Sequence, residues 1–315
     1  MYRQLSYRRL AIILICAVMI CLIIFRTQQI VQSERVELSP SPVITVLTPQ
    51  GNCSQMELER FLIGVVAAEM PATFEPEALK AQAVAARSYI FRRLESAQGK
   101  HASAQICCDP NCCQAWLSDE QLRQNWGHDY AEKIQRIAAA VQSTCGETLT
   151  YNDAVIDAAF CSTCGGRSEN ADECWSNYVP YLQSTPCRWC AHSPRYASHL
   201  TLSMEQAADL LGCSRQQLAD MQVQSYTAGG RVKELTLGGS SMKGTQLRSK
   251  LGLNSASFCW MIMGEQISFF SIGFGHGVGM CQYGADGMAR EGNDYRQILA
   301  HYYRDTAITQ QYVSD

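Results

Sequence analysis

The segment Phe61–Arg93 constrains the fold most strongly, because it predicts two helices with an abrupt break between them. Apolar residues recur at helical spacing up to Ala68. The pair Met70-Pro71 then ends this helix, since a residue that precedes proline is disfavoured in the α region. Pro76 suits the first position of the second helix. The buried stripe of that helix is expected at Leu79, Ala83, Ala86 and Ile90.

Glu69 stands at the break. A carboxylate at the C-terminal end of an apolar helix opposes the helix dipole by roughly 0.3–1 kcal/mol, and the small apolar residues around it offer no partner in sequence. Such a group tends to have a raised pKa, which suits a general acid near neutral pH. A glutamate turned toward water at a helix end is the simpler interpretation, and the local sequence leaves both open.

An uninterrupted apolar run occupies residues 10–25. As a helix it would cover roughly 24 Å, close to the thickness of a hydrocarbon core. Three arginines precede the run and no comparable cluster follows it, so residues 1–9 are expected in the cytoplasm. A cleaved signal peptide is the alternative, but no small-x-small site follows. We therefore predict a single-pass anchor over residues 10–26, with the rest of the chain outside.

Charge narrows the class of partner. Residues 1–26 carry four arginines and no acid, so the predicted exterior has 22 basic and 29 acidic residues, a net charge of −7. Nucleic acid and anionic lipid are poor main partners for such a surface. A neutral or mixed-charge ligand such as a glycan fits better.

The exterior is expected to form one mixed α+β domain with a substrate groove. Residues 27–52 are polar, contain a Ser-Pro-Ser-Pro break, and are predicted as a stalk that ends in a first strand at Val43–Leu47. Residues 53–315 then form the catalytic domain. Within it we predict a helix over Gln121–Ser143, a strand–turn–strand unit at Leu149–Ile156, a helix near Met204–Leu211 and a strand at Val232–Leu237. The sequence does not specify its topology.

A cysteine-rich loop follows the second helix. His101, Cys107, Cys112 and Cys113 form an H-x5-C-x4-C-C set, with Cys108 in reserve. Three thiols and an imidazole match the ligand number and chemistry of a tetrahedral zinc site. A pair of disulfides is the alternative, but adjacent cysteines do not easily pair and His101 has no part in it. We predict a zinc-binding loop over residues 101–113, structural because four protein ligands would close the shell of the metal.

Two further pairs have Cys-x2-Cys spacing, Cys161 with Cys164 and Cys187 with Cys190. They resemble a zinc ribbon, but 22 residues separate the pairs, more than is usual. Disulfides and a second metal both remain open. Between the cysteines of the first pair, Ser162 and Thr163 precede two glycines and are predicted to offer hydroxyls to a ligand.

A glycine-rich segment lies near the C-terminus, at residues 273–279. Its spacing and context differ from those of a dinucleotide-binding loop. We interpret it as a loop that brings His276, Gln282 and Tyr283 close to a ligand. A structural role for His276 in the loop is equally compatible with the sequence.

Three segments share a pattern. They are GVVAAEMPATFEPEALKAQAVAARSY from residue 64, FCSTCGGRSEN from residue 160 with Trp175 after it, and GFGHGVGMCQYGADGMA from residue 273. Together they strongly resemble the stage II sporulation protein D family of endospore-forming bacteria. The resemblance covers nearly all of the predicted exterior, in the same order and behind the same N-terminal anchor.

The resemblance implies a lytic transglycosylase that acts on peptidoglycan strands without stem peptides during engulfment of the forespore. It implies a location between the mother-cell and forespore membranes, and work with a sporulation amidase and a second membrane protein. The catalytic acid of the family corresponds to Glu69, and its functional basic residues correspond to Lys80 and Arg87. These two cations are expected two turns apart on one face of the second helix, where they would orient the saccharide or temper the pKa of Glu69. Lytic transglycosylases can use one carboxylate, because the C6 hydroxyl of the substrate closes on C1 and leaves a 1,6-anhydro end.

Clostridial-type members carry zinc on a histidine- and cysteine-containing loop, which residues 101–113 resemble. Cys112 stands where such relatives can have histidine, so the resemblance implies a thiol in place of an imidazole at this ligand position. Cys164 and Cys281 each replace a serine of the usual family motifs S-T-S-G-G and M-S-Q-Y-G-A. These changes weaken the case for an essential hydroxyl at either position.

Three alternatives to a transglycosylase are open. The first is a glycan-binding enhancer of a partner amidase, which some related proteins resemble. The second is a hydrolase with two carboxylates, in which Asp157 or Glu169 is the second. The third is a Cys-His hydrolase that uses Cys164 or Cys281 with His276, for which no orienting third group is evident.

Overall fold

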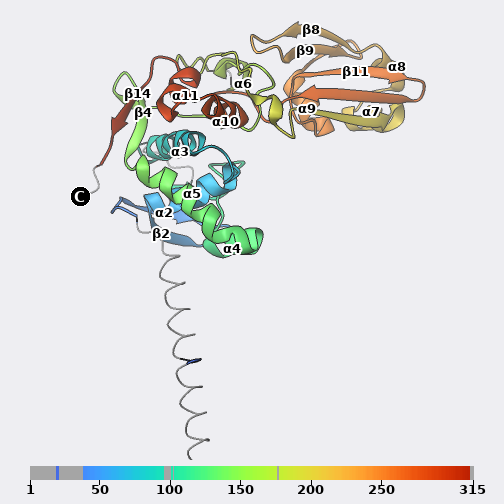
Figure 1. Cartoon of the computed structure of the whole chain (residues 1–315). Helices are drawn as coiled ribbons and strands as arrows, with labels where there is room; N and C mark the ends of the chain where they lie inside the picture. Colours follow the sequence, from blue (N-terminus) through green and yellow to red (C-terminus); the bar gives the residue numbers. More distant parts are fainter. Residues whose placement is uncertain (1–18, 21–37, 96–100, 102, 176, 313–315) are drawn as a thin grey trace, which may run out of the picture. The chain divides into compact units, whose positions relative to one another are not determined.

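A computed structural model of the chain describes residues 19–20, 38–95, 101, 103–175 and 177–312 (Figure 1). The chain divides into two units, Met1–Leu38 and Ser39–Asp315. Apart from Met19 and Ile20, the predicted anchor lies outside the described residues. Within the described residues, no helix combines the length and apolarity that a membrane crossing needs.

The predicted helix break is confirmed. Helix α2 (Leu58–Glu69) ends at Glu69, and Met70 before the proline is extended, with φ −124° and ψ 142°. Helix α3 begins at Pro76 and runs to Glu95, and the four residues of its predicted stripe are fully buried. Helix α3 packs against α2 on one side and against α10 and α11 on the other (Figure 1). The long helix is therefore the scaffold on which Glu69 is held.

One predicted helix is split. The pattern over residues 121–143 forms α4 (Asp119–Trp126), the short 3-10 helix η1 (Gly127–Asp129) and α5 (Tyr130–Ser143). The split falls at Gly127, whose φ of +52° is incompatible with a continuing helix. Ser118 starts α4 with a capping box, which sets the beginning two residues earlier than expected.

The first strand lies where it was predicted. Strand β1 (Val43–Leu47) pairs antiparallel with β2 (Cys53–Glu57) and parallel with β3 (Ile106–Cys107). Because β1 is hydrogen-bonded into this sheet, the compact unit begins at Ser39 and includes part of the predicted stalk. The same pairing brings the loop after β3 close to α2.

The segments that begin at residues 160 and 273 meet through short strands. Strand β6 (Phe160–Cys161) pairs in parallel with β13 (Met280–Cys281), which leads directly into α10 (Gln282–Arg290). Helix α11 (Tyr295–Tyr302) follows. A further sheet joins β14 (Ala307–Gln310), β4 (Glu147–Tyr151) and β5 (Ala154–Val155). The turn between β4 and β5 uses Asn152 and Asp153, both at positive φ, as the predicted strand–turn–strand signal requires.

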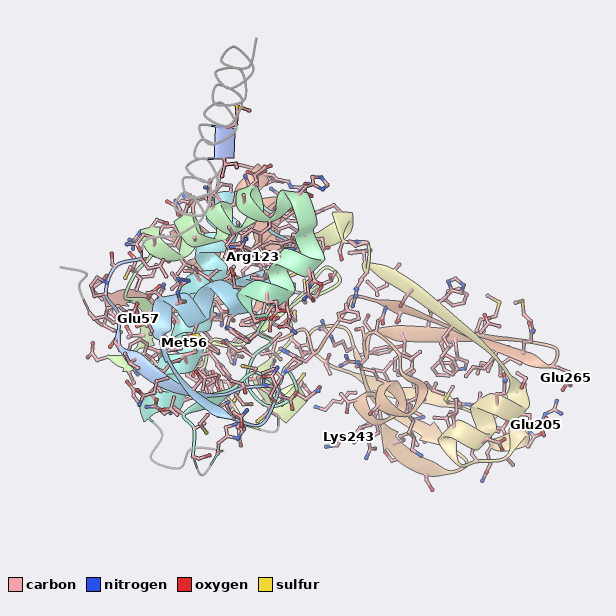
Figure 2. The ribbon with its side chains drawn as sticks, turned by 90° about the horizontal axis from the view of Figure 1, so that it is seen from below. Met56, Glu57, Arg123, Glu205, Lys243 and Glu265 are labelled. Atoms are coloured by element: carbon pink, nitrogen blue, oxygen red, sulfur yellow. The ribbon has the colours of Figure 1, made fainter. Side chains whose placement is uncertain are left out.

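Residues 197–272 form two further three-stranded sheets, of order β11-β12-β7 and β10-β9-β8, around their own apolar core. Ile267 and Phe269 are fully buried in that core, and Glu205, Lys243 and Glu265 are exposed at its surface (Figure 2). The predicted helix α7 (Met204–Leu211) and strand β9 (Val232–Leu237) are confirmed without a change of bounds. The other elements are β7 (Ala197–Ser203), α8 (Arg215–Ala219), β8 (Gln222–Tyr226), β10 (Ser240–Lys243), α9 (Gly244–Leu251), β11 (Phe258–Met263) and β12 (Gln266–Ile272), with α6 (Ala171–Trp175) and η2 (Cys190–His192) before them.

Candidate active site

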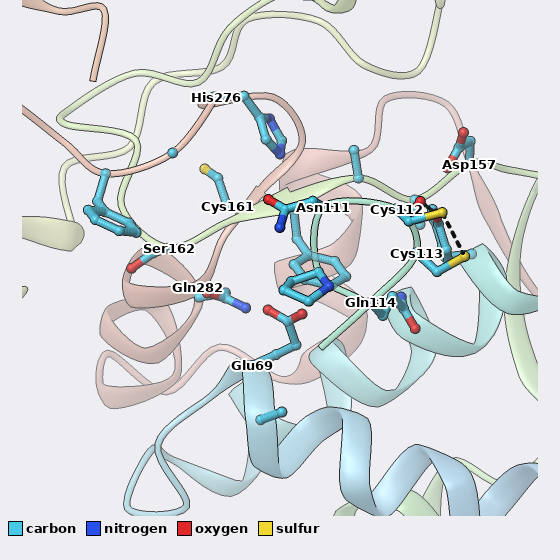
Figure 3. Close-up of a pocket in the computed structure, with 18 of the residues that line it drawn as sticks. Glu69, Asn111, Cys112, Cys113, Gln114, Asp157, Cys161, Ser162, His276 and Gln282 are labelled. Atoms are coloured by element: carbon cyan, nitrogen blue, oxygen red, sulfur yellow. Dashed lines mark hydrogen bonds between the residues drawn. The ribbon is translucent and has the colours of Figure 1, made fainter. Parts of the chain in front are cut away.

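A pocket of about 1070 Å³ joins segments that are far apart in the sequence (Figure 3). Its wall includes the end of α2, the cysteine loop at residues 110–114, the β6 region at residues 157–162 and the glycine-rich segment from residue 274. The helix break at Glu69, the cysteine loop, the Cys161-x2-Cys164 region and the glycine-rich segment therefore contribute to one cavity. This volume lies at the upper end of the range of ligand pockets, which is about 300–1,000 Å³.

Glu69 reaches into this pocket from the last residue of α2. Its Oε1 accepts a hydrogen bond of 3.0 Å from the backbone N–H of Ala115, and the side chain of Gln282 hydrogen-bonds the same carboxylate. Figure 3 shows the Gln282 amide pointing toward Glu69. Burial raises the pKa of Glu69, and these two hydrogen bonds offset part of the rise. Glu69 therefore keeps its proton to a higher pH than a glutamate in water does, which is the property a general acid needs.

The other candidate carboxylates are ion-paired. Asp157 also lines the pocket, and its carboxylate lies 3.6 Å from the guanidinium of Arg93. Glu169 is fully buried and lies 3.4 Å from Arg231, outside the pocket lining. Because Asp157 lines the pocket and Glu169 does not, a two-carboxylate mechanism would have to use Asp157. The ion pair of Glu169 is structural.

Ser162, Gln282 and Tyr283 line the pocket, as expected of ligand-binding residues. Pairing of β6 with β13 brings them together, and the backbone N–H of Tyr283 donates to Ser162 O at 3.1 Å. Thr163 differs from this group. Its hydroxyl is buried and hydrogen-bonded to Ser193 Oγ at 2.7 Å, so its side chain supports the loop and lies outside the pocket lining.

His276 lines the pocket but its ring nitrogens have backbone partners. Nδ1 accepts from the N–H of Val278 at 3.0 Å, and the ring also hydrogen-bonds the backbone of Phe160. Burial, with help from Arg248 and Arg231, lowers the pKa of His276 to about 4. The imidazole is neutral at physiological pH, which favours the structural interpretation of this histidine over a charged ligand contact.

The positions of Cys164, Cys281 and His276 do not support a Cys-His hydrolase. Cys164 and Cys281 are buried at 2% and 0% exposure and lie outside the pocket lining. His276 faces the cavity with its acceptor nitrogen already used by Val278. No arrangement of thiol, base and substrate follows from these positions in the part of the chain that the structure describes.

Lys80 and Arg87 do not reach the pocket lining, which corrects their predicted contact with saccharide. Arg87 is fully buried and forms a two-pronged ion pair with Glu59, with two bonds of 2.7 Å. It also donates to the carbonyl of Glu147 at 3.0 Å. Lys80 pairs with Glu77 on the surface of α3 at 2.6 Å. Helical spacing put these two cations on one face of α3, but Arg87 is turned into the core, where it also donates to the carbonyl of Val141 in α5 at 3.3 Å. Lys80 lies 5.8 Å from the centre of the Tyr295 ring in α11.

His101, Cys107, Cys112 and Cys113, here called the loop cluster, do come together. Their ligand atoms all lie within 4.8 Å of one another. His101 Nε2 is 3.6 Å from the sulfur of Cys112 and 3.7 Å from that of Cys113, and the two sulfurs are 4.0 Å apart (Figure 3). Zinc–sulfur bonds of about 2.3 Å in a tetrahedron hold sulfurs about 3.8 Å apart. The donor set and its spacing therefore fit a closed tetrahedral zinc site.

Gln114 is a pocket residue that sequence reasoning missed. It follows the cysteine pair, is 2% exposed, and neither polar atom of its amide has a hydrogen-bond partner among the described residues. An unpartnered buried amide costs stability, so Gln114 is a candidate for a ligand contact in this pocket. Arg195 also lines the pocket without having been predicted from the sequence, and its guanidinium lies 4.2 Å from the centre of the Phe274 ring. A lone amide or cation has no spacing pattern by which to find it.

Comparison with known proteins gives consistent matches. The sequence model of the family described as SpoIID, stage II sporulation protein, matches residues 49–151. Stage II sporulation protein D of Bacillus subtilis (strain 168) is 39% identical over 280 residues, which cover 88% of this chain and 82% of the relative. The protein of the same name from Bacillus amyloliquefaciens is 39% identical over 277 residues, 86% of this chain and 80% of the relative. An amidase enhancer of Bacillus subtilis (strain 168) is 27% identical over 306 residues, 79% of this chain and 40% of the relative.

Proposed function

This chain belongs to the stage II sporulation protein D family, and from that premise we propose that it is a peptidoglycan lytic transglycosylase. Its substrate is the bond between N-acetylmuramic acid and N-acetylglucosamine in glycan strands without stem peptides. The observation that carries this proposal is the state of Glu69. It lies in the pocket with a raised pKa, while Asp157, the other carboxylate among the described lining residues, is paired with Arg93.

One carboxylate is enough for this reaction. Protonated Glu69 donates its proton to the glycosidic oxygen as the bond from that oxygen to C1 breaks, and the bonding electrons leave with N-acetylglucosamine. The Glu69 carboxylate then accepts the proton of the C6 hydroxyl as this oxygen bonds to C1. The product ends in 1,6-anhydro-N-acetylmuramic acid, and Glu69 is protonated again. No water is consumed, which distinguishes the reaction from hydrolysis.

The groups that bind the saccharide are the polar and aromatic residues of the pocket wall. Gln114 can donate to and accept from an N-acetyl group with its unpartnered amide. Tyr283 packs edge-on against Phe74, with ring centres 4.9 Å apart, and Ser162 offers a hydroxyl beside it. Gln282 holds Glu69 and so positions the proton. These residues take over the binding role expected of Lys80 and Arg87.

Zinc at the loop cluster is part of the proposal. His101, Cys107, Cys112 and Cys113 would hold it, and a shell of four protein ligands gives the metal a structural role. Cys113 lies two residues before Ala115, whose N–H binds Glu69. The loop cluster therefore fixes the position of that donor.

We also propose the setting of the reaction. The chain is anchored by residues 10–26 with its N-terminus in the cytoplasm, and its catalytic unit faces the space between the mother-cell and forespore membranes. It cuts strands during engulfment in a complex with a sporulation amidase and a second membrane protein. The relative named an amidase enhancer supports an association with an amidase.

Product analysis tests the proposal. Purified full-length protein, Glu69→Gln and Asp157→Asn are incubated with peptide-free glycan strands, and the ends are identified by mass spectrometry. Anhydro ends from the parent and from Asp157→Asn, with none from Glu69→Gln, are expected. Reducing ends that need Asp157 would indicate a two-carboxylate hydrolase. Stimulation of an amidase by Glu69→Gln, without cleavage by any of the three, would indicate an enhancer.

A further inference from the structure

Four cysteines outside the loop cluster converge on one buried point. Cys164 follows strand β6, Cys187 and Cys190 lead into η2, and Cys281 is the N-cap of α10. Their sulfur atoms all lie within 4.8 Å of one another, and no residue of the four is more than 2% exposed. We call this set the core cluster. Cys161, which shares Cys-x2-Cys spacing with Cys164, is outside it and lines the pocket instead.

The spacing of the core cluster suits a metal. The sulfurs of Cys164 and Cys190 are 3.8 Å apart, the separation of about 3.8 Å that zinc–sulfur bonds of about 2.3 Å produce in a tetrahedron. A disulfide would bring two sulfurs to about 2 Å and leave the other two thiols without that bond. The Cys187-x2-Cys190 spacing is also typical of structural zinc sites. One centre with four equivalent sulfurs is thus favoured over pairs.

Hydrogen-bond donors surround these sulfurs. The backbone N–H of Cys164 and that of Gly284 point to Cys281 Sγ at 3.2 and 3.3 Å. The hydroxyl of Tyr302 lies 3.1 Å from Cys187 Sγ. Cys281 also stands at the N-terminus of the nine-residue helix α10, where the helix dipole favours negative charge. These are the surroundings that stabilise thiolates.

The backbone around the cluster is shaped to bring the segments together. A Cβ on Gly284 would lie 2.5 Å from Cys187 Sγ and closer still to the Tyr302 hydroxyl, so α10 can approach only with glycine there. Gly165 and Gly166 turn the chain directly after Cys164, with φ of +80° and +108°. The carbonyl of Gly166 then accepts the N–H of Cys187 at 2.9 Å.

We propose a second zinc site, whose four thiolate ligands are Cys164, Cys187, Cys190 and Cys281. Binding replaces four S–H protons, which pass to solvent, with one Zn²⁺ and leaves a net charge of −2 on the centre. Neither oxidant nor reductant is required. The site has a closed shell and is structural. The inference does not depend on the transglycosylase proposal.

The core cluster joins two segments of the pocket wall, one that ends at Ser162 and one that begins at Gln282, to the Cys187–Cys190 segment, which lies outside the lining. Gln282, which hydrogen-bonds Glu69, directly follows Cys281. Ser162 lies two residues before Cys164 and its carbonyl binds the N–H of Tyr283. The metal therefore fixes one wall of the pocket relative to α3 without touching substrate.

Metal content tests this site. Full-length protein without a histidine tag is produced with added zinc, purified in mild detergent and analysed by plasma mass spectrometry. The parent should contain about two zinc ions per chain, and Cys164→Ser/Cys281→Ser and Cys112→Ser/Cys113→Ser about one each. The matched control Cys213→Ser/Cys259→Ser changes two cysteines outside both clusters and should retain about two.

A second measurement does not require the core variant to fold. X-ray absorption at the zinc edge of Cys112→Ser/Cys113→Ser should report four sulfur neighbours at about 2.3 Å and no nitrogen. A parent with about one zinc, which Cys112→Ser/Cys113→Ser loses, would overturn the site. So would peptide mapping of the parent that finds cysteines of the core cluster in disulfides.

Discussion

The loop cluster and the core cluster present similar ligands, but the chain builds them in different ways. The loop cluster comes from one segment, with its ends 12 positions apart, and it is partly exposed. The core cluster joins Cys164 to Cys281, which are 117 positions apart, and it is buried. The first can form when one loop closes. The second forms only when β6 has paired with β13 and α10 has docked, so it reports on the assembled fold.

Each cluster precedes a residue that hydrogen-bonds the Glu69 carboxylate. The N–H of Ala115, just after the loop cluster, binds Glu69 at 3.0 Å. The amide of Gln282, just after the core cluster, binds it as well. Glu69 itself projects from α2, which contains neither cluster. The chemistry and its two supports can therefore be altered separately, by five variants.

Glu69→Gln should have the largest effect, on catalysis alone. Removal of a general acid typically lowers a rate by about 10²–10⁴-fold, and here one residue acts as both acid and base, so we expect a loss of at least about 10³-fold. Both clusters should keep their zinc. The measurements are cleavage of peptide-free strands and metal content of the same preparation. A variant that loses metal together with activity would show that Glu69 also supports the clusters.

The same variant should be more stable than the parent at neutral pH. Because the folded-state pKa of Glu69 lies above its ordinary value of 4.5, the folded protein loses stability as pH rises from 4.5 through the raised pKa. Glutamine removes this cost, so its advantage in melting temperature should vanish below pH 4.5. Parent cleavage should fall over the same window as Glu69 loses its proton. An advantage independent of pH would contradict the raised pKa.

Cys164→Ser/Cys281→Ser should cause the largest loss of stability. A metal that stays bound to its ligands in the unfolded chain closes a loop of 117 positions at the core cluster and of 12 positions at the loop cluster. The longer loop lowers the conformational entropy of the unfolded chain more, which corresponds to about 2 kcal/mol of additional stability. Two buried polar hydroxyls also replace metal ligands. We expect unfolding free energy to fall by about 4 kcal/mol or more, measured by denaturant titration. Cys213→Ser/Cys259→Ser is the control, and a fall no larger than for that control would contradict a bound metal.

Cys112→Ser/Cys113→Ser should cost less, about 2 kcal/mol, because the loop that it releases is short and partly exposed. Cleavage should fall nonetheless, since the N–H of Ala115 lies two residues beyond the altered pair. The ratio of activity loss to stability loss should thus be higher than for the core cluster. Equal losses in both variants would remove the distinction between a local and a long-range support.

Local features could be predicted from the sequence because their signals are local. Proline ends α2 and starts α3 wherever the rest of the chain lies. The four side chains of the loop cluster lie within 13 residues, so their spacing alone predicts that they come together. Strand β1 and the turn at Asn152 likewise follow from short patterns.

Long-range features could not be predicted in this way. The Cys-x2-Cys pattern pointed to Cys161, but pairing of β6 with β13 makes Cys281 the fourth member of the core cluster. Helical spacing put Arg87 beside Lys80, and the partner that decides its role, Glu59, comes from another helix. In each case the deciding contact joins segments whose proximity depends on the whole fold.

Gln282→Ala and Gln114→Ala should have the smallest effects, and of different kinds. Loss of the Gln282 hydrogen bond, which lowers the pKa of Glu69, should raise that pKa further and move the alkaline limb of the pH–rate profile to higher pH.

Loss of Gln114 removes an amide without a partner among the described residues, so the free energy of unfolding should not fall. KM should rise about tenfold, or about 1.4 kcal/mol. If both variants shifted the pH profile equally, Gln114 and the loop cluster before it would act on the pKa of Glu69 and not on saccharide binding.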